Sequence, residues 1–340
     1  MYPLDRGSWG PTVRIGHLRD ELAEISRLDL VAGDRGARRL ALARYVTAGR
    51  LRGLDGVYVE SSSFLPAETD IAVLALARGL RIPVVTYVRD AYQLFPDAYP
   101  PATWRGRVGA ALFRPSMRAL RSVSTALAFP TRGLARAVLG PPGEAAPLLP
   151  PGAPTPVTVP RAAEANRLLF VGDARLPAHG VDRLLAAAAR AREHGTDVEV
   201  TVVCRPGQEP PGRAPDWVRI ERAEGAAIHD LLSDVVATVL PRPRSAYNDL
   251  ALPVKLYDYL AMGRPLLVTD CAEQARVVRE AGAGLVVGDG IDDLAAGIER
   301  LGDAGQGQRD AWAHAAHAAA AANSWSDRAR TIVGLIGATR

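Results

Sequence analysis

Two series of alternating strand and helix patterns, separated by a proline-rich segment, constrain the fold of this 340-residue chain. Short apolar runs such as VVATVL at residues 235–240 alternate with segments that place apolar residues at helical spacing, as at residues 68–80. This alternation is typical of parallel α/β layers. Eight of residues 140–160 are proline, a composition that builds no domain core. The sequence therefore predicts two α/β domains joined by a linker or an extended crossing segment.

The domain boundaries follow these patterns. We expect a Rossmann-like domain at residues 1–150, a linker at 151–164, a second Rossmann-like domain at 165–322 and a last helix at 323–340. Each domain is predicted to be doubly wound, and the two are expected to face each other across a cleft. The chain opens with MYPLDRGSWG, which reads as a turn where such a domain normally begins with a strand. The first strand is therefore expected to be missing or short, unless the true start lies upstream.

Composition narrows the class of protein. Apolar residues make up 48% and charged residues 23%, which fits a soluble globular chain. The two cysteines, Cys204 and Cys271, show no metal-ligand spacing. No apolar run approaches the ~20 residues that cross a bilayer, and no signal peptide is expected from the first residues. We therefore expect a cytoplasmic protein.

Positive charge is concentrated in the first half. Residues 1–150 carry 20 arginines against 13 carboxylates, and no acidic residue lies between Asp97 and Glu144. The arginines of this acid-free stretch are Arg105, Arg107, Arg114, Arg118, Arg121, Arg132 and Arg136. This segment is either an ordinary solvated face or a surface for anionic membrane lipid or an anionic substrate. Nucleic acid is not expected, because aromatic residues are sparse in the stretch.

The second half contains the only lysine in the chain. Lys255 is one of 41 basic residues, and the other 40 are arginines. Pro253 suits the first position of a helix, which places Lys255 in the first turn. Free backbone amides and the positive end of the helix dipole make such a turn an anion site. A compact ammonium follows a phosphate oxygen as a point charge, which a planar guanidinium does less easily. The alternative is a lysine retained by chance.

Several segments of the chain together resemble the GT-B glycosyltransferases, above all the retaining family 4 (group 1) and its relatives with a Pro-x-Lys-x-x-Glu-Tyr motif. In the second half these segments are RLLFVGDARLPAHGVDRLLAAA, VVCRPGQ, VVATVLPRP, LPVKLYDYLAMGRPLLVTD and AGAGLVV. In the first half, GSWGPTVRIGHLRDELA resembles the glycine-containing acceptor loop of that fold. LPPGAP resembles the segment before the donor domain, and NSWSDRARTIVGLI resembles the last helix, which crosses back to the first domain.

The resemblance implies a hexosyltransferase-like enzyme. It would move a sugar from a nucleoside-diphosphate sugar to an acceptor, with retention, and without a metal or other cofactor. Protein cations and helix amino termini would neutralise the leaving diphosphate. The acid-free stretch favours an anionic or lipid-linked acceptor, and a peripheral contact with the inner face of a membrane through Arg105–Arg136.

The resemblance also implies donor-binding roles for individual residues. Lys255 would contact the diphosphate, and Asp258 stands where family members carry a glutamate for the ribose hydroxyls. Gly172 would let the backbone approach phosphate closely. Arg175 and His179 are the nearest substitutes for two cations that the family usually carries here, and His179 would help only when protonated.

The loop before Pro253 departs from the family pattern. Leu250 stands where the family carries an earlier glutamate. Asn248 and Asp249 beside it would contact donor hydroxyls, or they are ordinary turn residues. Both interpretations stay open.

The first half supplies the candidate acceptor residues. Ser8, Trp9 and Gly10 would line the acceptor pocket, with Trp9 as a stacking face. Arg89 and Asp90 follow a predicted strand where related sequences often show His-Asp. Asp90 is a candidate general base for an inverting reaction, a plain loop carboxylate, or a structural partner of Arg89.

Two other functions compete with a transferase as interpretations of the sequence. One is a catalytically weak GT-B protein that acts as a binding or partner subunit. It is favoured by three absences: the first strand, the two cations that the family usually carries for the diphosphate, and the earlier glutamate of the family pattern. A dinucleotide oxidoreductase is excluded, because no strand-linked Gly-x-Gly-x-x-Gly occurs. The residues leave the sugar, the nucleotide base, the acceptor and the oligomeric state open.

Overall fold

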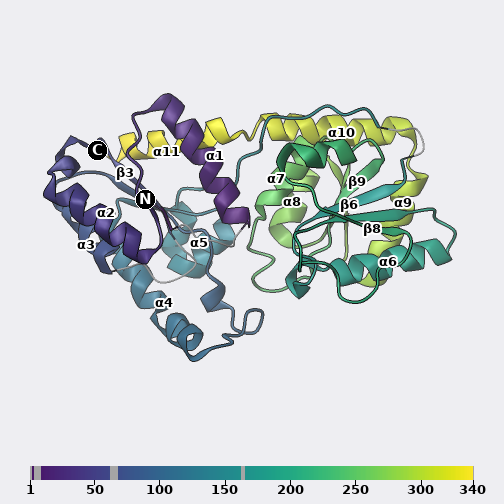
Figure 1. Ribbon diagram of the computed structural model, residues 1–340, viewed down its shortest axis with the longest axis horizontal. Helices are drawn as coiled ribbons and strands as arrows, with labels where there is room; N and C mark the ends of the chain where they lie inside the picture. Colours follow the sequence, from purple (N-terminus) through teal and green to yellow (C-terminus); the bar gives the residue numbers. More distant parts are fainter. Residues whose placement is uncertain (1, 4–8, 62–67, 162–164, 340) are drawn as a thin grey trace. The chain divides into compact units, whose positions relative to one another are not determined.

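The computed structural model describes residues 2–3, 9–61, 68–161 and 165–339. The chain divides into two compact units, Met1–Gly152 with Trp325–Arg340, and Ala153–Ser324. Both units are built from parallel strands and helices, as Figure 1 shows. Among the described residues, no helix is both long enough and apolar enough to span a membrane.

The first unit contains a three-stranded parallel sheet of order β3-β4-β5. Its strands are β3 (Val57–Glu60), β4 (Val84–Tyr87) and β5 (Ala126–Ala128). A separate parallel pair joins β1 (Tyr2–Pro3) to β2 (Ala32–Gly33). Since β1 is two residues long, the first strand is short, as the turn-like opening of the sequence predicts.

Helices surround this sheet and close the first core. They are α1 (Trp9–Ile25), α2 (Arg35–Thr47), α3 (Glu68–Gly79), α4 (Trp104–Val123), α5 (Arg132–Leu139) and α11 (Trp325–Ala338), with 3₁₀ turns η1 (Arg50–Gly53), η2 (Tyr92–Leu94) and η3 (Pro141–Ala145). Thr103 and Thr131 cap α4 and α5 by accepting hydrogen bonds from backbone amides three residues on. The core joins β4 to α3 and to the second half of α4, where Phe113 and Leu120 are buried.

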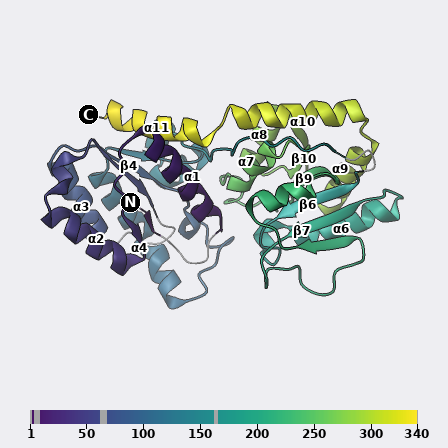
Figure 2. The same ribbon diagram turned by 45° about the horizontal axis from the view of Figure 1, so that its top comes forward.

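The second unit contains a six-stranded parallel sheet of order β11-β10-β9-β6-β7-β8. The strands are β6 (Arg167–Val171), β7 (Glu199–Val203), β8 (Val218–Glu221), β9 (Val235–Leu240), β10 (Leu266–Thr269) and β11 (Gly284–Val287). Figure 2 shows β10, β9, β6 and β7 in this order. The chain runs from β6 outward to β8 and then returns to β9 on the other side of β6. Ligands of doubly wound sheets bind at the carboxyl ends of strands at such a switch point.

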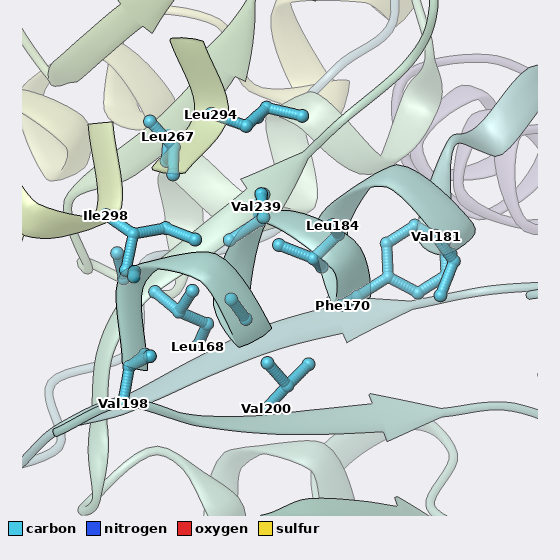
Figure 3. Packing of buried hydrophobic residues seen from close by; sticks show 14 of the residues in the cluster. Leu168, Phe170, Val181, Leu184, Val198, Val200, Val239, Leu267, Leu294 and Ile298 are labelled. Carbon is cyan, nitrogen blue, oxygen red and sulfur yellow. The ribbon is translucent and has the colours of Figure 1, made fainter. Parts of the chain in front are cut away.

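Helices pack around this second sheet. They are α6 (Val181–Glu193), α7 (Val254–Ala261), α8 (Ala272–Ala281), α9 (Ile291–Asp303) and α10 (Gln306–Ala321), with 3₁₀ turns η4 (Pro177–His179) and η5 (Gly225–Leu231). Figure 3 shows the core between β6, α6 and α9, where Leu168, Leu184 and Ile298 are almost fully buried. This rigid core fixes the loops at the carboxyl ends of β6 and β9.

One helical pattern is not realised in the structure. Residues 226–234 place apolar residues at helical spacing, which predicts a helix, but the structure has the 3₁₀ turn η5 there, and η5 itself buries only Ile228. The first part of the proline-rich segment 140–160 belongs to the first unit. Leu149 within it is fully buried, and its amide donates to the carbonyl of Phe129 next to β5.

The chain passes between the units at two places that are each anchored locally. Within the first unit, a β-carbon on Gly152 would lie 2.6 Å from the ring of Trp325, so glycine leaves room for the indole. Within the second unit, the amide of Ala153 donates to the carbonyl of Asn323 at 2.7 Å. The last helix α11, expected to return to the first domain, belongs to the first unit.

Candidate functional site: a perturbed lysine–aspartate pair at the switch point

Lys255 lies against the loop that follows β6. It occupies the first turn of α7, whose N-cap Pro253 provides no side-chain hydrogen bond. Its Nζ lies 2.5 Å from the position that a β-carbon on Gly172 would occupy, and 4.8 Å from the centroid of the Phe170 ring. Gly172 has φ of 142°, a conformation that L side chains rarely adopt. Glycine therefore provides both the backbone turn and the space for the ammonium.

The ammonium of Lys255 is held in an environment that disfavours its charge. Burial lowers its pKa to about 8, and Arg242 adds repulsion, while Asp258 and Asp173 oppose the shift. An anion that enters beside Nζ would relieve this penalty, because it favours the charged form. A bound phosphate would therefore stabilise the charged form of Lys255.

Asp258 lies one turn along the same helix and is also perturbed. Burial raises its pKa to about 7, and the Lys255 ammonium only partly offsets this. A carboxyl group near its pKa at neutral pH accepts hydrogen bonds when ionised and donates one when protonated. Neighbouring ionisable groups with strongly perturbed pKa values are typical of functional sites.

The loop after β6 contributes Asp173, Arg175 and His179. Asp173 accepts from the backbone amide of Arg175 at 3.0 Å and from its guanidinium at 3.1–3.2 Å. Burial opposes ionisation of Asp173, but the hydrogen bonds from Arg175 outweigh it and lower the pKa of the carboxyl. The exposed guanidinium of Arg175 is therefore folded onto its own loop.

His179 is neutral at pH 7. Burial lowers its pKa to about 4, with repulsion from Lys255 and Arg242 added. Its Nδ1 lies 2.6 Å from the carbonyl oxygen of Asp173, so Nδ1 donates a proton and Nε2 is left as an acceptor. His179 can accept a hydrogen bond from a hydroxyl but cannot supply the positive charge expected of it.

Arg242 is a cation of this site that the sequence reasoning missed. It follows β9 at the switch point and is 7% exposed. Its Nη2 donates to Oδ1 of Asn248 at 2.5 Å and its Nη1 to the carbonyl of Ala251 at 3.2 Å. An arginine between two prolines directly after a predicted strand was the available signal.

The two polar residues before α7 are engaged with the protein. Asn248 is 2% exposed and also donates to the carbonyl of Pro243 at 2.8 Å. Asp249 accepts from Arg244 at 3.0 Å and from the backbone amide of Ala272 at 3.2 Å, where it helps to cap α8. These contacts are those of turn-stabilising residues. Leu250 lies beside them, half-buried in the same loop.

The expected acceptor residues fall in the first unit. Ser8 lies outside the described residues, and Trp9 and Gly10 begin α1. Arg89 and Asp90 follow β4, where Nε of Arg89 donates to Oδ2 of Asp90 at 2.6 Å. The ion pair corresponds to the structural role considered for Asp90, and its use as a base stays a prediction.

A second buried charge cluster lies deeper in the first unit. Arg14 of α1 and Glu60 at the end of β3 are 1% and 4% exposed and form an ion pair of 3.1 Å. The guanidinium of Arg14 lies 3.9 Å from the centroid of the Tyr87 ring. Neither Nη1 of Arg14 nor Oε2 of Glu60 has a hydrogen-bond partner among the described residues. The pair joins α1 to the carboxyl end of the sheet.

The match to a known protein family lies within the second unit. Residues 165–303 match the family model described as "Glycosyl transferases group 1". This part of the chain is similar to group 1 glycosyltransferase domains. It contains the Gly172 loop, Arg242 and the whole of α7, so the site lies within the matched region. No curated protein sequence matches the chain significantly.

Solved structures extend the likeness of the group 1 domain to the whole fold. HepE of Anabaena, in complex with UDP and glucose, has a TM-score of 0.66 and 13% identity over 99% of this chain and 98% of that chain. A sucrose-phosphate synthase of Thermosynechococcus elongatus scores 0.64 with 14% identity over 96% and 93%. A trehalose-phosphate synthase of Burkholderia xenovorans scores 0.60 with 12% identity over 97% and 79%. The predicted GT-B fold is confirmed.

Among the described residues, no group of three or more histidine, cysteine, aspartate or glutamate side chains is arranged to hold a metal ion.

Proposed function

We propose that this chain transfers a sugar from a nucleoside-diphosphate sugar, bound by the second unit, to an acceptor. The proposal depends above all on the position of Lys255, whose ammonium lies over Gly172 at the amino end of α7. Backbone amides, a helix dipole and a compact cation converge there, which is the environment that a diphosphate requires. The match of residues 165–303 to the group 1 glycosyltransferase model supports a sugar nucleotide as the source of this diphosphate.

Loss of the diphosphate is the step that this site would assist. Charge develops on the leaving phosphate, and Lys255 and the first-turn amides of α7 would stabilise it. Arg242 adds positive potential at Lys255, although its guanidinium donates its hydrogen bonds to Asn248 and Ala251. These groups would replace the charge of a metal ion, so we propose a metal-independent reaction.

Two further assignments complete the donor site. Asp258, in its ionised form, would accept hydrogen bonds from the ribose hydroxyls. Nε2 of His179 is an acceptor in the neutral ring and would contact a hydroxyl of the donor, rather than the phosphates.

We propose retention of configuration. Asp90 is the candidate base for an inverting reaction, but its carboxylate is ion-paired with Arg89. In a retaining reaction of this type the leaving phosphate takes the acceptor proton, and no carboxylate base is needed. The proposed acceptor is an anionic or lipid-linked compound. The proposed location is the cytoplasmic face of a membrane, reached through the basic segment Arg105–Arg136.

A second candidate, a partner subunit without turnover of its own, is favoured by one observation. Arg175 is bound to Asp173 and His179 is neutral, so Lys255 is left with few mobile cations to assist it. Such a site would bind a nucleotide without activating the sugar.

Release of nucleoside diphosphate separates the two candidates. The full chain is incubated with UDP-, GDP- and dTDP-hexoses and a membrane lipid extract, with and without EDTA. We expect release from one donor, unchanged by EDTA and lost in Lys255→Ala. Arg279→Ala, which removes an exposed charge from α8, is the control and should keep full activity. Nucleotide binding without release from any donor would favour the partner subunit, and dependence on a divalent cation would refute the metal-independent reaction.

A further inference from the structure

The first half of α4 exposes an apolar stripe. Trp104, Val108 and Leu112 lie four residues apart, on one face of the helix, and are 64%, 46% and 45% exposed. No residue from Trp104 to Leu112 is buried, and the contact of α4 with the core begins at Phe113. In Figures 1 and 2, α4 lies at the periphery of the first unit. The stripe is thus additional to the apolar face that folding requires.

A row of arginines runs beside the stripe. Arg107, Arg114, Arg118 and Arg121 follow one another at intervals of seven, four and three residues, so they share a face of the helix. All four are exposed. Within the described ranges, none of their guanidinium groups takes part in an ion pair or hydrogen bond, although most arginines elsewhere pair with carboxylates.

The remaining arginines of the acid-free stretch are engaged or lie at its end. Arg132 donates to the carbonyl of Ala146 at 2.8 Å, and Arg136 is ion-paired with Glu144. Arg105 lies over the ring of Trp104, at 5.5 Å from its centroid. The available positive charge is therefore on α4 and not on α5.

We infer that this face of α4 docks on an anionic lipid bilayer. Trp104, Val108 and Leu112 enter the region of the headgroups and upper acyl chains, and the arginine row contacts lipid phosphates. A tryptophan at the end of the stripe suits the membrane interface, because its ring is apolar and its N–H is polar. The inference assigns the membrane contact proposed above to one helix face, and it does not require nucleotide binding.

Other occupants fit this face less well. Nucleic acid would use the arginines but has no need of Val108 and Leu112 beside them. A second copy of the chain would bring like charges of the two arginine rows together. A bilayer uses both the stripe and the row.

Co-sedimentation with vesicles tests the inference on the full chain. The vesicles are neutral phosphatidylcholine, or phosphatidylcholine with 30% phosphatidylglycerol, in low and in high salt. We expect binding to the anionic vesicles only, weakened by salt. Because each arginine near an anionic surface contributes about fivefold in affinity, Arg114→Glu with Arg118→Glu should weaken binding by about 25-fold or more. Val108→Gln with Leu112→Gln should also weaken it. A blue shift of the tryptophan fluorescence should be lost in Trp104→Phe.

Matched controls carry the same changes elsewhere. Arg279→Glu with Arg300→Glu reverses two exposed charges on α8 and α9, and Leu40→Gln with Leu76→Gln replaces two exposed leucines on α2 and α3. Both controls should bind vesicles like the wild type. Circular dichroism of every variant shows that it is folded, and nucleotide titration separates failure of this inference from failure of the transferase proposal. The inference is overturned if the wild type does not sediment with anionic vesicles, or if both α4 variants bind as well as the controls. Preference for a short DNA duplex over the vesicles, reduced by the arginine changes alone, would assign the face to nucleic acid.

Discussion

The ammonium nitrogen of Lys255 lies 2.5 Å from the position that a β-carbon on Gly172 would occupy. A side chain on the β6 loop and the ammonium at the start of α7 are therefore mutually exclusive in this arrangement. The glycine and the single lysine of the chain, 83 residues apart, form one structural unit.

Gly172→Ala should weaken nucleotide binding almost as much as loss of the lysine. The new methyl group displaces the ammonium, and the backbone at φ of 142° is strained by a β-carbon. Gly195→Ala is the matched control, because Gly195 also has positive φ, 96°, but has nothing within 4 Å of its β-carbon position. Titration calorimetry of both variants decides the point. Equal affinities in the two variants would contradict the claim that the space above Gly172 must stay free for Lys255.

Nucleotide affinity should be greatest between pH 7 and pH 8. The pKa of Lys255 is lowered to about 8, so above pH 8 binding of an anion must first take up a proton, and affinity should fall. The pKa of Asp258 is raised to about 7, so below pH 7 the protonated carboxyl loses its acceptor role. Calorimetry from pH 6 to pH 9.5 measures both limbs. The alkaline limb should vanish in Lys255→Ala, and its persistence there would exclude Lys255 as its source.

Asp258→Asn should stabilise the protein at pH 8. The carboxyl has a pKa of about 7 in the folded chain and an ordinary value of 3.8. Its ionisation therefore destabilises the folded state. This destabilisation is complete above pH 7 and disappears as the pH falls towards 4. Because the group is partly solvated, we expect a gain of about 1–3 kcal/mol, which shrinks with falling pH. Thermal unfolding at several pH values measures it. Asp216→Asn, at an exposed carboxylate, is the control. No gain at pH 8 would mean that Asp258 is not under a burial penalty.

The buried pair in the first unit should be sensitive to removal of one partner. Arg14→Met leaves the carboxylate of Glu60 buried without a counter-charge, which costs about 3–5 kcal/mol. The double replacement Arg14→Met with Glu60→Met should cost less than the sum of the single changes. Hydrogen exchange in β3 and β4 during urea unfolding reports on this unit separately. Replacement of Arg330, exposed on α11 and paired with Asp327, should change stability by less than about 1 kcal/mol. An additive cycle would contradict the coupling of Arg14 and Glu60.

The elements that the sequence could predict are those with a continuous apolar run or a clear helical periodicity. Strands such as β9, buried at all six positions, and helices such as α6 follow directly from apolar runs and helical periodicity. Helix α4 was not recognised. Pro115 lies within it, and its first half presents apolar residues to solvent, so its pattern does not match that of a core-facing helix.

Residues of the candidate site could be predicted only where the residue type and its position in the sequence indicate the chemistry. Lys255 and Gly172 could be identified by residue type and position. The engagement of Asp249 with Arg244 and α8, and the loss of charge on His179, depend on contacts between loops that periodicity does not encode. Arg242 was missed for the same reason, since its hydrogen bonds join loop segments whose geometry only the folded sheet defines.

Calorimetric titration of UDP, GDP and dTDP into the wild type and Lys255→Ala tests the central claim most directly. The account predicts that one nucleotide binds, and that loss of a charge-assisted phosphate contact weakens it by ~1.5–3 kcal/mol, or roughly 10- to 150-fold. Arg279→Ala should bind as the wild type does. Binding that is unchanged in Lys255→Ala, or no binding of any of the three nucleotides to the folded wild type, would contradict the account.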